Sequence, residues 1–543
     1  MEGRASMSPV PIPPAASLGT LPRMTRAEPS APSDETGDLA ADPLPGWLAI
    51  ALVTGTSAAV LVLEILAGRL LAPYVGVSLE TFTGIIGVIL AGIAVGAWAG
   101  GVAADHIDPR RLLPPLLLLG GALAIATIPI VRTLGDTSGT GGGIRILILT
   151  TFGFLPSATV LSAVPPAVIK LQLLDLASTG STVGRLSAWS TAGALFGTFF
   201  TGYVLVAAAA VTTLIVIVGL VLVASGIALW AVGRVRKVNE MLSLTAVAAL
   251  SLFGAVAIDS PCETQTAYYC LSVLEDPTLD SGRTLLLDDL RHSYVDLDDP
   301  ERLEFWYIRR LVDAIEVETS GPIDIAYLGG GAFTIPRYVR ATRPGSEQII
   351  LEIDGDLVEV VENEIDFDRG DDVEIIVGDG RLSMRELPTD SVDVVIGDAF
   401  GSRAVPFHLA TREFIEEVDE VLRPGGIYAA NIIDGPEERF VEAYAATVAE
   451  VYEHVVVVRG PGPLQGFRGN SALIASHEPI DVAALGERLA ADVDPSDTPE
   501  QTADPDRVVG EIVTGDALVD YVAGAEVITD DFAPVDQLLA ASS

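Results

Sequence analysis

The sequence is poor in lysine, cysteine and histidine. Its 543 residues include two cysteines, five histidines and 32 basic against 73 acidic side chains, for a net charge of −41; the lysines are Lys170 and Lys237. This balance excludes a nucleic-acid partner, because phosphate contacts need clustered lysine and arginine. The cysteines, Cys262 and Cys270, have no histidine near them, so we expect no metal site. They would pair in an oxidising compartment and remain thiols in the cytosol.

Charge is nearly absent from the long apolar runs of the first half. Residues 1–257 hold 13 acidic and 13 basic side chains, whereas residues 258–543 hold 60 and 19 and carry the whole net charge. Mean hydropathy is +0.46, which indicates membrane spans. We predict a disordered tail rich in Pro, Ala and Ser over 1–45, without a cleavable signal peptide, and a transmembrane domain of about seven helices over 46–258. The expected spans are 47–71, 81–103, 112–131, 145–169, 187–209, 211–233 and 240–258.

The loops between the spans predict a multi-pass protein of the cell membrane but leave its orientation open. Basic residues gather in alternate loops, around 110, 170 and 236, and the positive-inside rule makes their face cytoplasmic. Seven spans then place the acidic half outside the cell. A disulfide between the two cysteines fits that location, but a nucleotide cofactor does not, because such metabolites are made in the cytosol. Within the first span, Glu64 is costly in lipid and indicates either an ion pair with Arg69 or a polar path.

The acidic second half predicts a halophilic source. Concentrated salt screens the self-repulsion that would destabilise such a domain in dilute buffer. An acidic protein from a GC-rich genome is the alternative.

The second half predicts an α/β fold with a small N-terminal β-subdomain. Strands over Tyr268–Val273 and Arg283–Leu287, joined by a turn at 280–282, and a helix over Glu304–Glu316 form the subdomain at 259–318. Over 319–543, near-continuous apolar strands alternate with helices, which predicts a Rossmann-like domain of the class I methyltransferase type with a parallel sheet covered on both faces. The strands are Ile323–Leu328, Gln348–Leu351, Glu374–Val377, Val392–Ile396 and Ile427–Ile432, with helices over Leu357–Glu364 and Glu413–Leu422 and a helix and loop insertion over 480–525.

Glycine and acidic residues follow four of these strands, at the sheet edge where such folds bind ligands. The Gly329–Gly331 turn lets a ligand approach the backbone at the positive start of the next helix. Glu352 suits two hydrogen bonds to ribose hydroxyls, and Asp379 can accept a hydrogen bond from an adenine amino group. Asp398 would face the reacting centre. His292 and Tyr294 line the pocket, or His292 is bonded within the β-subdomain. Trp306 and Tyr307 are expected in the core.

These segments resemble the spermidine synthases, the polyamine aminopropyltransferases, over about 260–480 and a short tail. The membrane half is similar to the multi-span region of membrane-fused members, which is distantly like half of a major-facilitator transporter. The matching segments are Gly329–Gly331, Leu351–Asp354, Gly378–Gly380, Leu422–Gly426, Thr529–Val535 and, in the first span, Glu64–Tyr74.

The resemblance implies transfer of an aminopropyl group from decarboxylated S-adenosylmethionine to an amine, with release of methylthioadenosine. It implies that Asp398 is the base, because an ammonium group cannot attack. The implied partners are a small-molecule amine and the lipid bilayer, and a homo-oligomer is left open. The expected cofactor-binding residues are Gly329, Gly330, Gly331, Glu352, Asp379, Gly380 and His292.

The sequence departs from the family pattern in four places. Ala332 and Gly401 replace two aspartates, Tyr307–Arg309 replaces a Tyr-His-Glu run, and a glutamine expected near the cofactor aligns with His292. We therefore predict a membrane-bound enzyme with the nucleotide half of the site kept and the acceptor half divergent. Two alternatives stay open: a methyltransferase that uses S-adenosylmethionine itself, and a polyamine or cation transporter or sensor with a non-catalytic nucleotide-binding domain.

Overall fold

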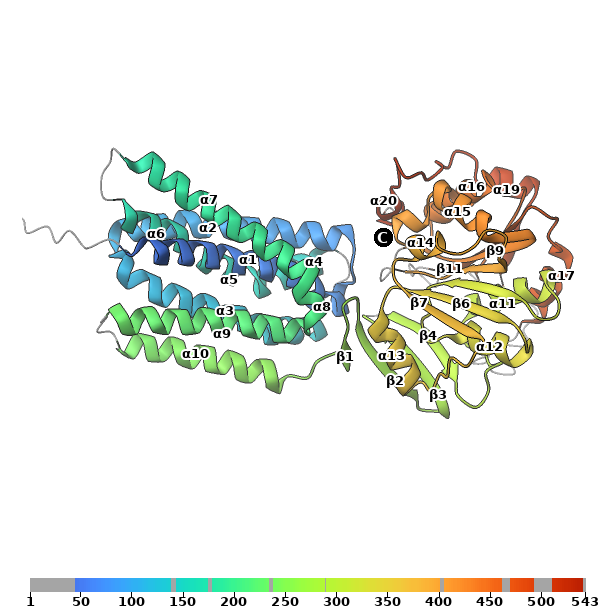
Figure 1. The fold of residues 1–543 in the computed structure, drawn as a ribbon, viewed down its shortest axis with the longest axis horizontal. Helices are drawn as coiled ribbons and strands as arrows, with labels where there is room; N and C mark the ends of the chain where they lie inside the picture. The colour runs from blue at the N-terminus through green and yellow to red at the C-terminus, as the bar shows by residue number, and fades with distance from the viewer. Residues whose placement is uncertain are drawn as a thin grey trace, which may run out of the picture. The chain divides into compact units, whose positions relative to one another are not determined.

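The computed structural model describes residues 44–137, 143–173, 178–233, 238–288, 290–400, 405–460, 469–492 and 510–540. The tail predicted over 1–45, except its last two residues, and Gly401 therefore lie outside the described residues. The described residues between Gly46 and Ala257 are mostly helical, and two sheets with flanking helices follow (Figure 1).

Helices occupy all seven segments for which the sequence predicts a membrane span. Among the described residues, four helices are long and apolar enough to cross a bilayer. A fifth span arises if the segments Gly143–Gly153 and Leu155–Gln172, which meet at a bend of 44°, count as one. The count of seven therefore stays a prediction. The helices are α1 (Gly46–Val75), α2 (Leu79–His106), α3 (Pro109–Thr137), α4 (Gly143–Gly153), α5 (Leu155–Ser162), α6 (Val164–Gln172), α7 (Thr179–Phe200) with the π-turn η2 (Thr201–Leu205) and α8 (Val206–Ala208), α9 (Val211–Gly233) and α10 (Val238–Ala257). The four are α1, α2, α3 and α9.

Glycines let these helices approach one another closely. A Cβ atom added to Gly96 of α2 would lie 2.1 Å from the carbonyl oxygen of Thr159 in α5. A Cβ atom added to Gly193 of α7 would lie 2.2 Å from the carbonyl oxygen of Thr54 in α1. Any larger residue would force the helices apart, as expected for small residues at helix contacts in lipid.

A four-stranded antiparallel sheet opens the C-terminal region, in the order β1 (Thr264–Gln265), β2 (Cys270–Asp276), β3 (Leu279–Leu287) and β4 (Leu290–Asp296). The turn predicted at 280–282 is wrong, because those residues belong to β3 and the chain turns at Pro277 and Thr278. The Asp276 carboxylate fixes that turn by accepting hydrogen bonds from the backbone N–H (2.8 Å) and hydroxyl (2.7 Å) of Thr278. Cys262 and Cys270 form a disulfide.

An eight-stranded sheet follows, in the order β12-β10-β11-β9-β8-β5-β6-β7. The five strands from β7 to β9 are parallel, as predicted. The strands are β5 (Asp324–Leu328), β6 (Glu347–Glu352), β7 (Val373–Val377), β8 (Val392–Gly397), β9 (Leu422–Asp434), β10 (His454–Arg459), β11 (Gly469–Ser476) and β12 (Glu511–Val513). The helices are α11 (Trp306–Glu318), α12 (Thr334–Thr342), α13 (Gly355–Glu364), α14 (Gly380–Met384), η3 (Phe407–Leu409), α15 (Arg412–Val421), α16 (Arg439–Ala449), α17 (Val482–Ala491), α19 (Asp516–Tyr521) and α20 (Val535–Ala540).

Alternation along the strands divides the core into two layers. Ile325 and Tyr327 of β5 face one layer, which α11, α12, α13 and α17 cover, whereas Ala326 and Leu328 face the layer covered by α14, α15 and α16 (Figure 1). Strands buried on both faces need apolar residues at every position, which is why the sequence shows continuous runs there.

The antiparallel part of the sheet departs from the expected all-parallel arrangement. β10 and β11 pair antiparallel over His454–Arg459, β11 pairs antiparallel with β9, and β12 adds to the edge of β10. Part of the insertion expected over 480–525 therefore supplies an edge strand as well as the helices α17 and α19.

Candidate active site

The register of the parallel strands brings the predicted site residues to one edge of the sheet. Leu328 of β5 pairs with Leu351 of β6 and with Gly397 of β8, and Glu352 pairs with Val377 of β7. The residues that follow these positions, including the glycine turn and the acidic residues, therefore lie together at the carboxyl ends of four neighbouring strands.

The glycine turn has a backbone that only glycine adopts readily. Gly329 and Gly331 have positive φ angles of 84° and 52°. A Cβ atom at Gly329 would lie 2.6 Å from the carbonyl oxygen of Asp398, so the turn packs directly on the end of β8. The N–H of Ala332, just after the turn, donates to Ser293 Oγ of β4 at 3.1 Å. The turn is thus fixed between the two sheets.

Glu352 holds the turn from the next strand. Its buried carboxylate accepts hydrogen bonds from the N–H of Gly330 at 2.9 Å and the N–H of Asp354 at 3.0 Å. Burial raises the pKa of this carboxyl, and the two backbone donors oppose that rise. The side chain therefore has a fixed place beside Gly330, where the sequence analysis expects the ribose.

Asp379 begins α14 and faces a histidine that the sequence analysis missed. One carboxylate oxygen caps the helix, accepting from the N–H groups of Arg381 (3.1 Å) and Leu382 (3.0 Å). The other lies 3.1 Å from Nε2 of His408 in η3. Gly380 follows, and a Cβ atom there would lie 3.1 Å from the Leu328 side chain. Asp379 and His408, at the position expected for the adenine, are thus partly exposed, and the apolar side chain of Leu328 lies beside them.

Asp398 lies in a polar pocket after β8. Its N–H donates to the carbonyl of Leu328 (3.0 Å), and its carboxylate accepts from Asn431 Nδ2 (2.8 Å). Burial raises the pKa of Asp398 to about 6, and the Asn431 amide and the nearby Tyr307 hydroxyl oppose the rise. Asn431 in turn accepts from Asn470 Nδ2 at 2.9 Å. The sequence analysis missed both asparagines and expected Tyr307 to be core.

His292 lies near this pocket, and Tyr294 does not. The ring of His292 is 6.4 Å from that of Phe400, and burial lowers the pKa of His292 to about 4, which keeps it neutral. The expectation that Tyr294 lines the pocket is wrong, because its hydroxyl donates to Asp276 at 3.0 Å within the small sheet.

No protein-family model matches the chain. A polyamine aminopropyltransferase of Vibrio vulnificus is 28% identical over 137 residues, which are 24% of this chain and 46% of the relative. One of Pyrobaculum aerophilum is 30% identical over 210 residues, 37% of this chain and 64% of the relative. A solved probable spermidine synthase from Corynebacterium glutamicum is 26% identical, covers 50% of this chain and 97% of its own, and has a TM-score of 0.44. The chain is therefore similar to the polyamine aminopropyltransferases, the spermidine synthases. It spans between about half and two thirds of the length of these two curated relatives.

Two departures from the spermidine synthase pattern have a structural explanation. Ala332, in place of an aspartate, is fully buried, with its methyl group in the apolar core below the turn. Arg309, in place of a glutamate, forms a buried ion pair with Asp492 (2.8 Å) and donates to the carbonyl of Glu304 (2.8 Å). Neither side chain contributes a charge to the Asp398 pocket.

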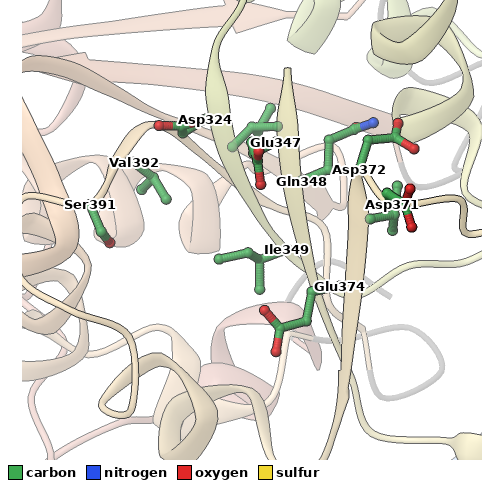
Figure 2. Close-up of a pocket in the computed structure, with 11 residues that line it drawn as sticks. Asp324, Glu347, Gln348, Ile349, Asp371, Asp372, Glu374, Ser391 and Val392 are labelled. Carbon is green, nitrogen blue, oxygen red and sulfur yellow. The ribbon is translucent and has the colours of Figure 1, made fainter. Parts of the chain in front are cut away.

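A cavity of about 490 Å³ lies at the opposite edge of the sheet, between the amino ends of β5, β6, β7 and β8 (Figure 2). Arg423 pairs with one of its carboxylates, Asp324, at 2.6 Å. The cavity is therefore separate from the candidate active site. Its acidic lining residues are Asp324, Glu347, Asp371, Asp372 and Glu374.

Proposed function

We propose that this protein is a membrane-bound aminopropyltransferase that uses decarboxylated S-adenosylmethionine. The observation that supports this proposal most is the position of Asp398, half-buried at the end of β8 and packed against the glycine turn that Glu352 holds. In this proposal Glu352 binds the ribose, and Asp379 and Gly380 bind the adenine. The likeness to polyamine aminopropyltransferases supports it.

Asp398 would take the proton of the attacking amine. The amine nitrogen forms a bond to the aminopropyl carbon, the bond from that carbon to the sulfonium sulfur breaks, and methylthioadenosine leaves with the electron pair. A pKa of about 6 leaves Asp398 ionised near neutral pH and able to accept the proton. The sulfonium is already a good leaving group, so alignment of the amine supplies much of the remaining rate.

We propose that the acceptor carries one ammonium group in this pocket. The described groups around Asp398 are neutral: the Tyr307 phenol, the amides of Asn431 and Asn470, and the unprotonated His292 ring. A second buried ammonium would have no carboxylate to pair with, and an unpaired buried charge is costly. Amines with one charge are therefore expected to react faster than diamines of similar length.

The test is product identification with the full chain in detergent and concentrated potassium chloride. Decarboxylated S-adenosylmethionine and a panel of mono- and diamines are supplied, and mass spectrometry measures methylthioadenosine and the aminopropylated amine in equal amounts. Transfer from S-adenosylmethionine with release of S-adenosylhomocysteine would instead establish a methyltransferase. Tight methylthioadenosine binding without either product would contradict both enzymes.

A second candidate function is cation movement through the helical region, and Glu64 favours it. One Glu64 carboxylate oxygen is buried and has no hydrogen-bond partner among the described residues, and no ion pair with Arg69 is present there. Helix α1, which carries Glu64, packs against the bent α5 and α6. Broken helices and membrane acids are typical of transport pathways. Glu64→Gln would abolish flux of a cation into vesicles and leave methylthioadenosine binding unchanged; unchanged flux would remove this candidate.

A further inference from the structure

Two asparagines from different strands form a chain of amides that ends on Asp398. Asn470 Nδ2 of β11 donates to Asn431 Oδ1 at 2.9 Å, and Asn431 Nδ2 of β9 donates to Asp398 Oδ1 at 2.8 Å. Asn431 is 3% exposed, so it cannot exchange these partners for water. We propose that Asn431, held by Asn470, is a positioning residue that fixes the Asp398 carboxylate for proton transfer. This inference rests on the proposed function.

The fold brings the three side chains together through strand alternation. Ile396, Ala429 and Ala472 face the core layer covered by α11. Asp398, Asn431 and Asn470 each stand two residues from one of these positions and so face the same side. Asn431 pairs with Ala472 across β9 and β11, which makes Asn470 its diagonal neighbour on that face.

Elementary chemistry fixes the direction of the chain. An ionised carboxylate only accepts hydrogen bonds, so Asn431 must present its NH₂ group to Asp398. Its carbonyl oxygen then points away and needs a donor, and Asn470 supplies one. Without Asn470 the Asn431 amide could rotate and place its oxygen against the carboxylate. The outer asparagine thus selects the orientation of the inner one.

Tyr307 completes the arrangement from the other side. It stands on α11, and its hydroxyl donates to the carbonyl oxygen of His292 at 3.3 Å and lies near enough to Asp398 to lower the pKa of that carboxyl. Among the described residues of the packed elements, the titratable groups that face this pocket are Tyr307 on α11 and His292 on β4, with Tyr269, bonded to the carbonyl of Phe400 at 3.0 Å, beyond them. None is a carboxylate, so loss of an amide would not be offset by another charge.

The test compares pH profiles of kcat/KM for the full chain with Asn431→Ala, Asn431→Asp and Asn470→Ala. Asn363→Ala is the matched control, because Asn363 is exposed and bonds within its own helix at 2.7 Å. Loss of one hydrogen bond to an ionised group raises its pKa by about one unit, so N431A should lose roughly fivefold near pH 6 and recover above about pH 8. N470A should shift in the same direction by less. N431D should shift further, because a like charge would stand beside Asp398.

The titration of the acceptor amine is common to all variants and cancels in the comparison. A loss that is equal at every pH, or a N431A profile like that of N363A, would overturn the inference and leave Asn431 a packing residue. Methylthioadenosine binding should stay within about twofold of the unsubstituted protein, since neither asparagine belongs to the nucleotide half of the site.

A second measurement works without turnover. The difference in Tm between each protein and its Asp398→Asn counterpart, followed against pH, reports the titration of Asp398 in the folded state. In N431A this difference should continue to change at a higher pH than in the unsubstituted protein; superimposed curves would contradict the inference. If the unsubstituted protein shows no transfer while the curves separate, the proposed function fails and the positioning role stands.

Discussion

Replacement of Glu352 by glutamine should weaken nucleotide binding. The carboxylate uses its two oxygens for two different backbone N–H groups, those of Gly330 and Asp354. Glutamine has one oxygen, so its NH₂ group must face one of these donors. The turn then loses one hydrogen bond, and the ribose loses a charged acceptor.

The size of the effect follows from those contacts. A hydrogen bond to a charged group contributes about 1.5–3 kcal/mol, so loss of the ribose contact alone should weaken methylthioadenosine binding by roughly 10- to 100-fold. Folding stability should change less, because a buried neutral amide costs less to desolvate than the carboxylate, whose pKa is raised by burial. The lost hydrogen bond lowers the folding stability, whereas the smaller desolvation cost of the amide raises it, so the two effects oppose each other.

Isothermal titration of the full chain in detergent with methylthioadenosine measures the affinity directly. Glu359→Gln is the control, because Glu359 is an exposed glutamate on the neighbouring helix α13. The control should bind within about twofold of the unsubstituted protein. If E352Q binds as tightly as E359Q, Glu352 does not contact the ribose and the placement of the nucleotide is refuted.

Three further predictions concern stability. Reduction of the Cys262–Cys270 disulfide, or the double serine variant, should lower the stability of the small sheet by about 2–3 kcal/mol; an unchanged melting curve with dithiothreitol would contradict this. Arg381→Ala leaves Glu417 (2.8 Å) with Arg385 as its remaining cation and Asp530 (2.7 Å) without one. It should cost roughly 1–2 kcal/mol in chemical unfolding, against little for Arg369→Ala, whose pair is more exposed. Residues 258–543 hold 60 acidic and 19 basic side chains, and concentrated salt screens their mutual repulsion. Tm should therefore rise by several degrees between about 0.2 and 3 M potassium chloride, and a Tm that does not change would argue against a salt-adapted protein.

Much of the fold could be predicted because buried parallel strands have a distinctive pattern. The five strands from β5 to β9 lie within a few residues of their predicted positions, and the acidic and glycine residues at their ends come together as expected. The carboxyl ends of parallel strands share one edge of the sheet. The proximity of Gly329, Glu352, Asp379 and Asp398 could therefore be predicted without knowledge of side-chain contacts.

The missed residues depend on contacts that the linear pattern does not specify. Asn431 and Asn470 are 39 positions apart, and only the antiparallel pairing of β9 with β11 makes them neighbours. His408 meets Asp379 through the short helix η3, which has no periodic signal. Tyr307 was expected in the core because an apolar stripe surrounds it, although a phenol is also suited to bond a buried carboxylate. In each case the sequence gives the residue type at one position but does not show which distant residue it contacts.

The proposal depends most directly on Asp398 as the proton acceptor. The deciding measurement is single-turnover release of methylthioadenosine from decarboxylated S-adenosylmethionine and a monoamine, by the full chain and by Asp398→Asn, near pH 8. We predict amine-dependent release that falls by roughly 10²- to 10⁴-fold in D398N, with methylthioadenosine affinity kept, because a general base contributes about that much. Equal rates in the two proteins, or release that does not depend on the amine, would contradict the proposed mechanism.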